Sequence, residues 1–192
     1  GFRVLRPQPR GVGESKGPMT GLTLHDFARD MAAVIRHEGG GPAVMVGHAF
    51  GNWVARMTAV DYPDLVRGVH AAYAKAGADV LETNTFGANR LKLSQYGLES
   101  QVREINRAAA RIAREVAGDD HLVAGAVGPL GVRMEPYGAT SVEEAYLTFH
   151  EQMEALKEGG VDLFLLETFG DLAEISQGIR AARAVDPTMP VI

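Results

Sequence analysis

The sequence contains no cysteine among its 192 residues. It therefore cannot form a disulfide, offer a thiolate nucleophile or hold a metal through thiolate ligands. It also lacks any apolar run long enough to cross a membrane, and it has no segment with the pattern of a secretory signal peptide. We accordingly expect a cytoplasmic protein that has no membrane partner.

The sequence also has only a small excess of one sign of charge. The 19 Lys and Arg residues against 24 Asp and Glu residues leave a formal net charge of -5 at pH 7. This balance gives no electrostatic reason to bind nucleic acid. The six histidines show no metal-ligand spacing, and no GxGxxG or Walker sequence is present, so the sequence predicts neither a metal nor a cofactor.

Short apolar runs separated by turns and helical spacings recur along the chain. They predict strands at residues 2–5, 42–46, 78–82, 121–126, 161–166 and 190–192. Together with the helices between them, these runs indicate an α/β fold with a mainly parallel sheet of about six strands and flanking helices. An open doubly wound sheet and a partial (β/α) barrel both fit this pattern. Either form leaves exposed parallel edges, which favour a homodimer.

Two of the predicted strands end in nearly the same residues. One is followed by Glu82-Thr-Asn-Thr-Phe-Gly87 and the other by Glu167-Thr-Phe-Gly170. Side chains at the carboxyl ends of parallel strands share one edge of the sheet, where α/β proteins place their binding sites. Two functions are open for these residues. They could bind a small polar ligand, or they could cap turns and bond their own backbone.

Three motifs in order closely resemble the homocysteine S-methyltransferase domain, a zinc-dependent (β/α)8 barrel. They are Glu82-Thr-Asn-Thr-Phe-Gly-Ala-Asn89, Val127-Gly-Pro-Leu-Gly131 and Leu165-Leu-Glu-Thr-Phe169. The resemblance covers about residues 69–192, without the first and last strands of the barrel. It implies that Glu167 helps to hold the amino group of homocysteine, and that Thr83, Asn84 and Thr85 face this amino-acid-like ligand.

The same resemblance implies a zinc ion bound by cysteines of the later strands. Because this sequence has no cysteine, it could not activate the homocysteine thiol as a zinc thiolate. The acidic glycine-rich motif of the family's first strand is missing as well. The resemblance therefore implies a ligand-binding site more readily than catalysis.

Residues 1–68 resemble part of an α/β-hydrolase. Gly47-His-Ala-Phe-Gly51 follows an apolar run and precedes a helical spacing, as in the nucleophile elbow of those enzymes. Ala49 stands where the elbow presents serine, which excludes nucleophilic attack from this position. His48 remains a catalytic candidate, paired with Glu82 or Glu167 if the two fragments share one sheet edge.

We interpret the chain as one α/β domain over residues 1–192, built from a hydrolase-like fragment (1–68) and a methyltransferase-like fragment (69–192). On this interpretation it is a recombined or engineered chimera with no evolved catalysis, because both sets of catalytic groups are missing. One alternative is a binder of homocysteine-like amino acids or a vestigial homocysteine S-methyltransferase, which would use Glu167 and Asn84. A second alternative is an esterase that uses a non-serine group such as His48.

Overall fold

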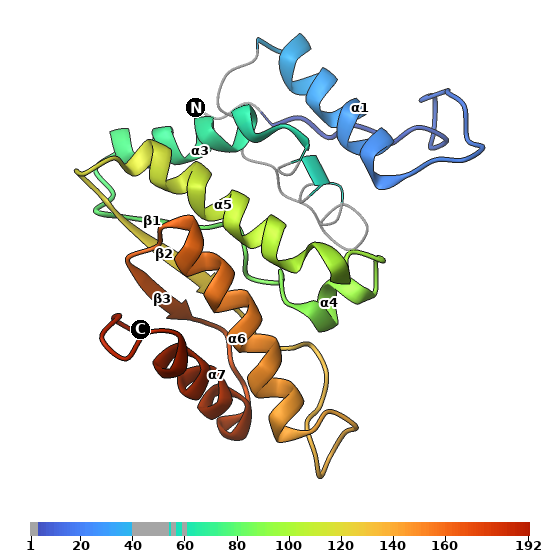
Figure 1. Ribbon diagram of the computed structural model, residues 1–192. Helices are drawn as coiled ribbons and strands as arrows, with labels where there is room; N and C mark the ends of the chain where they lie inside the picture. Colours follow the sequence, from blue (N-terminus) through green and yellow to red (C-terminus); the bar gives the residue numbers. More distant parts are fainter. Residues whose placement is uncertain (1–3, 40–53, 55–56, 59–60) are drawn as a thin grey trace. The chain divides into compact units, whose positions relative to one another are not determined.

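The computed structural model describes residues 4–39, 54, 57–58 and 61–192 (Figure 1). The chain divides into two compact units, Gly1–Ala72 and Tyr73–Ile192, which we describe separately. In the described residues, no helix has the length and apolar character needed to cross a membrane. The interpretation of residues 1–192 as one domain stays a prediction.

The first unit is mainly helical in its described part. Helix α1 (Leu24–His37) begins after Thr23, the predicted cap, and the backbone N–H of Thr23 donates to Asp26 Oδ2 at 3.0 Å. Helix α3 (Pro63–Lys75) starts in this unit. Two alanines on α1, Ala28 and Ala32, are fully buried. The expected helix is therefore present with its N-terminal boundary as predicted.

The strand expected at residues 2–5 is not formed by its described residues. Val4 and Leu5 belong to no strand, and they are 80% and 44% exposed. Two apolar residues without a hydrogen-bonded neighbouring strand cannot form a ladder. The strand expected at residues 42–46, together with His48 and Ala49, lies outside the described residues.

A parallel sheet forms the centre of the second unit. Its strands are β1 (Val80–Glu82), β2 (Leu122–Val127) and β3 (Leu163–Leu166), in the order β1-β2-β3. Leu81 pairs with Val123, and Ala126 pairs with Leu165. Every connection between these strands contains a helix, as parallel pairing requires.

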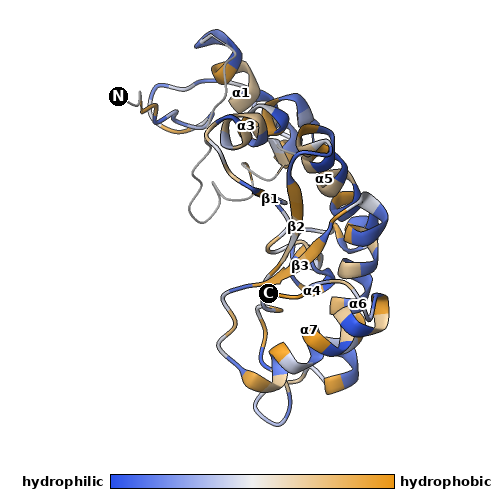
Figure 2. Ribbon diagram, turned by 90° about the vertical axis from the view of Figure 1, so that its left-hand side faces the viewer, coloured by the Kyte–Doolittle hydropathy of each residue, from blue (hydrophilic) through white to orange (hydrophobic). Residues whose placement is uncertain are grey.

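The helices of this unit pack along the sheet. They are α4 (Arg90–Ser94), η1 (Glu99–Gln101), α5 (Val102–Ala117), α6 (Val142–Gly159) and α7 (Leu172–Val185). Helices α5 and α6 lie on the same side of the strands in both views (Figures 1 and 2), and α7 packs beside α6. The strands themselves are largely hydrophobic (Figure 2), as expected where helices cover a parallel sheet.

The described residues form three strands, so the expected number of six is wrong for this part of the chain. The segment expected as a strand at 190–192 pairs with β3 through one bridge, between Phe164 and Val191. The Phe164 N–H donates to the Pro190 carbonyl oxygen at 3.0 Å. Pro190 has no N–H to give to the ladder, and the pairing is too short to count as a strand.

The core lies between the sheet and helices α5 and α6, where Phe149 and Phe164 are fully buried. The side of α5 that faces this core carries mainly small residues, and the isoleucines Ile105 and Ile112 are only half-buried. Its buried residues are Val102, Asn106, Ala110, Ala113 and Ala117. A Cβ on Gly159 of α6 would lie 2.4 Å from Ala110 Cβ. The two helices are therefore so close that small residues must fill the interface.

Candidate functional site

Two glutamates meet at the carboxyl edge of the sheet. Glu82 is the last residue of β1 and Glu167 directly follows β3, so each lies at the end of a strand that neighbours β2. The two carboxyl groups are close enough for Glu167 to raise the pKa of Glu82 through its charge and a side-chain hydrogen bond. Strand β2, between them, carries no titratable residue. The structure therefore brings the predicted ligand residue Glu167 together with Glu82.

The environment of Glu82 favours its protonated form. Glu82 is exposed as a residue, yet partial withdrawal of its carboxyl group from water, the hydrogen bond with Glu167 and the charge of Glu167 raise its pKa to about 7. Two carboxyl groups can share a hydrogen bond only when one of them holds a proton. Near pH 7, Glu82 is therefore protonated for about half of the time.

The two threonines of the first motif point into the protein. Thr83 Oγ1 and Thr85 Oγ1 lie 2.7 Å apart, the Ala126 N–H donates to Thr83 Oγ1 at 3.0 Å, and Thr85 Oγ1 donates to the Ala126 carbonyl at 2.7 Å. Both threonines are buried, whereas Asn84 between them is exposed. The hydroxyls thus continue the contact of β1 with β2, and Asn84 faces solvent. A ligand contact by any of the three stays a prediction.

The motif Val127-Gly-Pro-Leu-Gly131 has a structural role that its sequence did not reveal. The Gly128 N–H donates to the Phe86 carbonyl at 3.0 Å, and a Cβ on Gly128 would lie 2.3 Å from the Phe86 ring. Only glycine therefore allows this turn to lie against the Glu82 motif. The turn brings the strand ends of β1 and β2 together.

Sequence reasoning missed one buried carboxyl group beside this turn. Glu174 of α7 is 7% exposed, and its Oε1 accepts a 2.6 Å hydrogen bond from the Leu130 N–H. Burial raises the pKa of Glu174, while the Leu130 hydrogen bond acts in the opposite direction. The available signal was its position, three residues after the N-cap Asp171.

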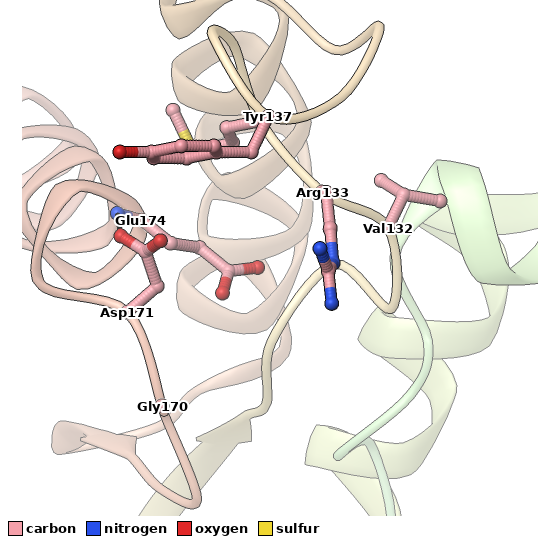
Figure 3. Close-up of a pocket in the computed structure, with 7 residues that line it drawn as sticks. Val132, Arg133, Tyr137, Gly170, Asp171 and Glu174 are labelled. Atoms are coloured by element: carbon pink, nitrogen blue, oxygen red, sulfur yellow. Dashed lines mark hydrogen bonds between the residues drawn. The ribbon is translucent and has the colours of Figure 1, made fainter.

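A cavity of about 300 Å³ opens next to these residues (Figure 3). The segment after β2 contributes Val132, Arg133, Met134 and Tyr137, and the start of α7 contributes Gly170, Asp171 and Glu174. Charged groups of both signs and an aromatic ring surround it (Figure 3). This lining suits a small polar ligand that carries both charges.

The residue after Glu167 has an unusual backbone. Thr168 has φ 63°, and in the described part of the chain no other non-glycine residue has a positive φ. A β-branched residue in this region is strained, and such strain is found most often at functional sites. Thr168 connects Glu167 to Gly170, which lines the cavity.

The zinc ion that the resemblance implies does not fit the residues present. The sequence contains no cysteine. Among the described residues, no three His, Asp or Glu side chains gather where they could hold a metal ion. Two carboxyl groups sharing one proton do not make a zinc site of the usual four ligands. We therefore assign no step through zinc to these residues.

Comparison with known proteins relates this geometry to one family. Residues 39–192 match the profile of the Homocysteine S-methyltransferase family. Methionine synthase of Mycobacterium leprae (strain TN) is 33% identical over 127 residues, which are 63% of this chain and 10% of that protein.

Two crystal structures of the homocysteine methyltransferase MmuM from Escherichia coli are similar in fold. The oxidised form has a TM-score of 0.63 and 25% identity over 84% of this chain and 58% of its own. The apo form has a TM-score of 0.55 and 27% identity over 76% and 56%. The chain thus spans less than two thirds of each of these relatives.

These matches correct our interpretation of the chain. The prediction of a recombined or engineered chimera without evolved activity is wrong, because one family profile runs continuously from residue 39 through the expected junction near residue 68. The matches do not show the α/β-hydrolase resemblance of residues 1–68. They favour the alternative that relates the chain to homocysteine S-methyltransferases. The chain belongs to the homocysteine S-methyltransferase family.

Proposed function

We propose that this chain binds homocysteine at the carboxyl edge of its sheet, as part of a homocysteine S-methyltransferase site. The observation that carries the proposal is the pair formed by Glu82 and Glu167. A pair of acidic side chains that offers oxygen acceptors from two strand ends is complementary to the ammonium group of an amino acid. The MmuM structures, named as homocysteine methyltransferases, support this choice of ligand.

Binding would replace the shared proton with the ligand. The ammonium group offers three N–H donors, and its positive charge favours the ionised form of both carboxyl groups. Glu82 then loses its proton, and both glutamates accept from the ammonium. Asn84 is exposed two residues beyond Glu82, and its side-chain amide can donate to the ligand carboxylate. Thr83 and Thr85 would act indirectly, by holding the backbone on either side of Asn84.

We also infer that the sheet is part of a barrel and not of a doubly wound sheet. Helices α5 and α6 lie on one side of the strands, with α7 packed beside α6 (Figures 1 and 2). A doubly wound sheet carries helices on both faces, whereas a (β/α) barrel carries them on the outside only. The predicted homodimer and cytoplasmic location stay predictions, and sedimentation velocity would test the first.

Calorimetry with the intact chain tests the proposed ligand. We expect homocysteine and methionine to give saturable heats, because both carry the amino group that the carboxyl pair would hold. Glu167→Gln replaces one carboxyl group of the pair by an amide and should weaken the binding of both ligands strongly. Glu104→Gln makes the same chemical change at an exposed position of α5 and should leave it intact. Absence of heat with the unchanged chain would contradict the proposal.

A further inference from the structure

Two buried amide side chains hold the Thr83–Asn89 segment from the helix side of the sheet. Gln152 of α6 donates through Nε2 to the Thr85 carbonyl at 2.8 Å. Asn106 of α5 donates through Nδ2 to the Ala88 carbonyl and to the Val102 carbonyl of its own helix, both at 2.8 Å. Both side chains are fully buried. Neither residue lines the cavity, and the proposed ligand contacts do not include them.

Each amide leaves its oxygen without a partner. Gln152 Oε1 and Asn106 Oδ1 are buried and accept no hydrogen bond from the described residues. A buried acceptor without a donor lowers stability, and an apolar side chain of similar shape would avoid that loss. Reversing either amide would place its oxygen against a carbonyl oxygen. An apolar residue at either position could not donate an N–H to the segment. This N–H is therefore what the glutamine and the asparagine contribute there.

The contacts restrain the segment on the C-terminal side of its exposed residue, Asn84. The Thr85 carbonyl also accepts from the Ala88 N–H at 2.9 Å, so Gln152 acts on a turn that is already formed. At the end of the segment, Asn89 Oδ1 accepts from the Lys92 N–H and caps α4. Asn84 directly precedes Thr85 in the sequence. A shift of the turn would therefore move Asn84 relative to Glu82.

We propose that Gln152 and Asn106 are positioning residues of the ligand site, which set the place of Asn84 by holding the carbonyls of the Thr83–Asn89 segment. This inference rests on the proposed function, since it assumes that Asn84 contacts the bound amino acid. It adds two residues from the helix layer to a site otherwise formed by strand ends. Their effect on ligand affinity is transmitted through the backbone and not through direct contact.

The test replaces Gln152 and follows the segment in two ways. Gln152→Met keeps the length of the side chain and removes the donor together with the unpartnered acceptor, so the chain should still fold. We expect faster hydrogen exchange at the Ala88 amide relative to the amides of β2. We also expect homocysteine to bind roughly two- to tenfold more weakly, the range of one neutral hydrogen bond.

Two further variants separate positioning from a general loss of packing. Met153→Ala opens a space at the neighbouring, fully buried position of α6; it should lower stability while the Ala88-to-β2 exchange ratio and the homocysteine affinity stay unchanged. Gln152→Glu can donate to the Thr85 carbonyl only when protonated. Its affinity relative to the unchanged chain should therefore fall as the pH rises.

The outcomes distinguish this inference from the proposed function. If the unchanged chain gives no heat with homocysteine, the proposed function fails. Hydrogen exchange at the Ala88 amide then decides by itself whether Gln152 restrains the segment. If homocysteine binds the unchanged chain and Gln152→Met equally well, the positioning inference is overturned and the proposed function stands. An Ala88-to-β2 exchange ratio that Gln152→Met leaves unchanged would overturn the inference whatever the calorimetry shows.

Discussion

The two strand ends that share Glu-Thr have different structures. After Glu82, the chain turns inward, and Thr83 and Thr85 bond to each other and to the backbone of Ala126. After Glu167, the chain stays at the surface, and Thr168 is exposed with a positive φ. Only the glutamates act together, since Glu167 raises the pKa of Glu82.

The difference shows what a repeated motif does and does not determine. The glutamate position follows from the end of an apolar strand, which is local in sequence. The role of the threonine depends on whether a neighbouring strand continues past it. β2 extends beyond β1 to Val127, so Thr83 has backbone groups to bond. Thr168 has no such contact in the described structure.

The largest effect should come from removing the charge of the pair. We expect Glu167→Gln to weaken homocysteine binding by about 2 kcal/mol, roughly 30-fold, the range of one hydrogen bond to a charged group. Glu82→Gln should weaken it less, because Glu82 already holds a proton for part of the time near pH 7. Calorimetry on both variants measures the difference. Equal losses would show that the two strand ends are equivalent.

The threonines should differ in their effect on stability. Thr83→Val removes the acceptor for the buried Ala126 N–H, and we expect the free energy of unfolding to fall by about 1–3 kcal/mol. Thr168→Val makes the same change at an exposed residue, and it should stay within about 0.5 kcal/mol. Urea unfolding followed by circular dichroism gives both values. A similar loss for the two variants would contradict the distinction.

Stability should depend on pH through Glu82. Its pKa in the folded chain is about 7, above the ordinary value of 4.5. The stabilisation from the shared proton is therefore complete below about pH 4.5 and is lost as the pH rises through about 7. Glu82→Gln keeps a donor toward Glu167 at every pH. The urea midpoint of the unchanged chain should thus fall relative to that of this variant between pH 5 and 8. If the two midpoints change with pH in the same way, the raised pKa of Glu82 is contradicted.

The smallest effect should come from the backbone at Thr168. Glycine adopts a positive φ without steric cost, but it gains more freedom on unfolding. We expect Thr168→Gly to stabilise the chain by about 1 kcal/mol or less, since relief of a strained residue is of order 1–3 kcal/mol before this loss. Thr83→Gly, at the matched position, should destabilise. Thermal unfolding of the two variants would show whether the signs differ.

Local signals in the sequence predicted the elements well where one residue decides a boundary. Ser141, a residue type that favours the N-cap position, caps α6, with its Oγ accepting from the Glu144 N–H at 3.1 Å. The sequence also placed Glu167 at a strand end. It did not reveal that Glu82 would be the partner of Glu167, because their meeting depends on the order of strands in the sheet.

Features that depend on close approach were not predictable from one sequence. The sequence around Gly128 indicates a turn, but it does not show that this glycine lies against Phe86. The isoleucines of α5 are only half-buried, because the close approach of Gly159 selects the alanines for the buried side. Asn106 and Gln152 lie in helices whose pattern gives no reason to bury an amide. In each case a residue distant in sequence decides the role.

The sheet order also has a consequence for folding. The two glutamates come from strands that never pair with each other, and each joins β2 through a helical crossover. Contacts between distant parts of a chain form late, because the loops between them must close first. The carboxyl pair can exist only after both crossovers have docked. A ligand held by this pair would thus bind the completed unit and none of its partly folded precursors, and it would shift the folding equilibrium by mass action.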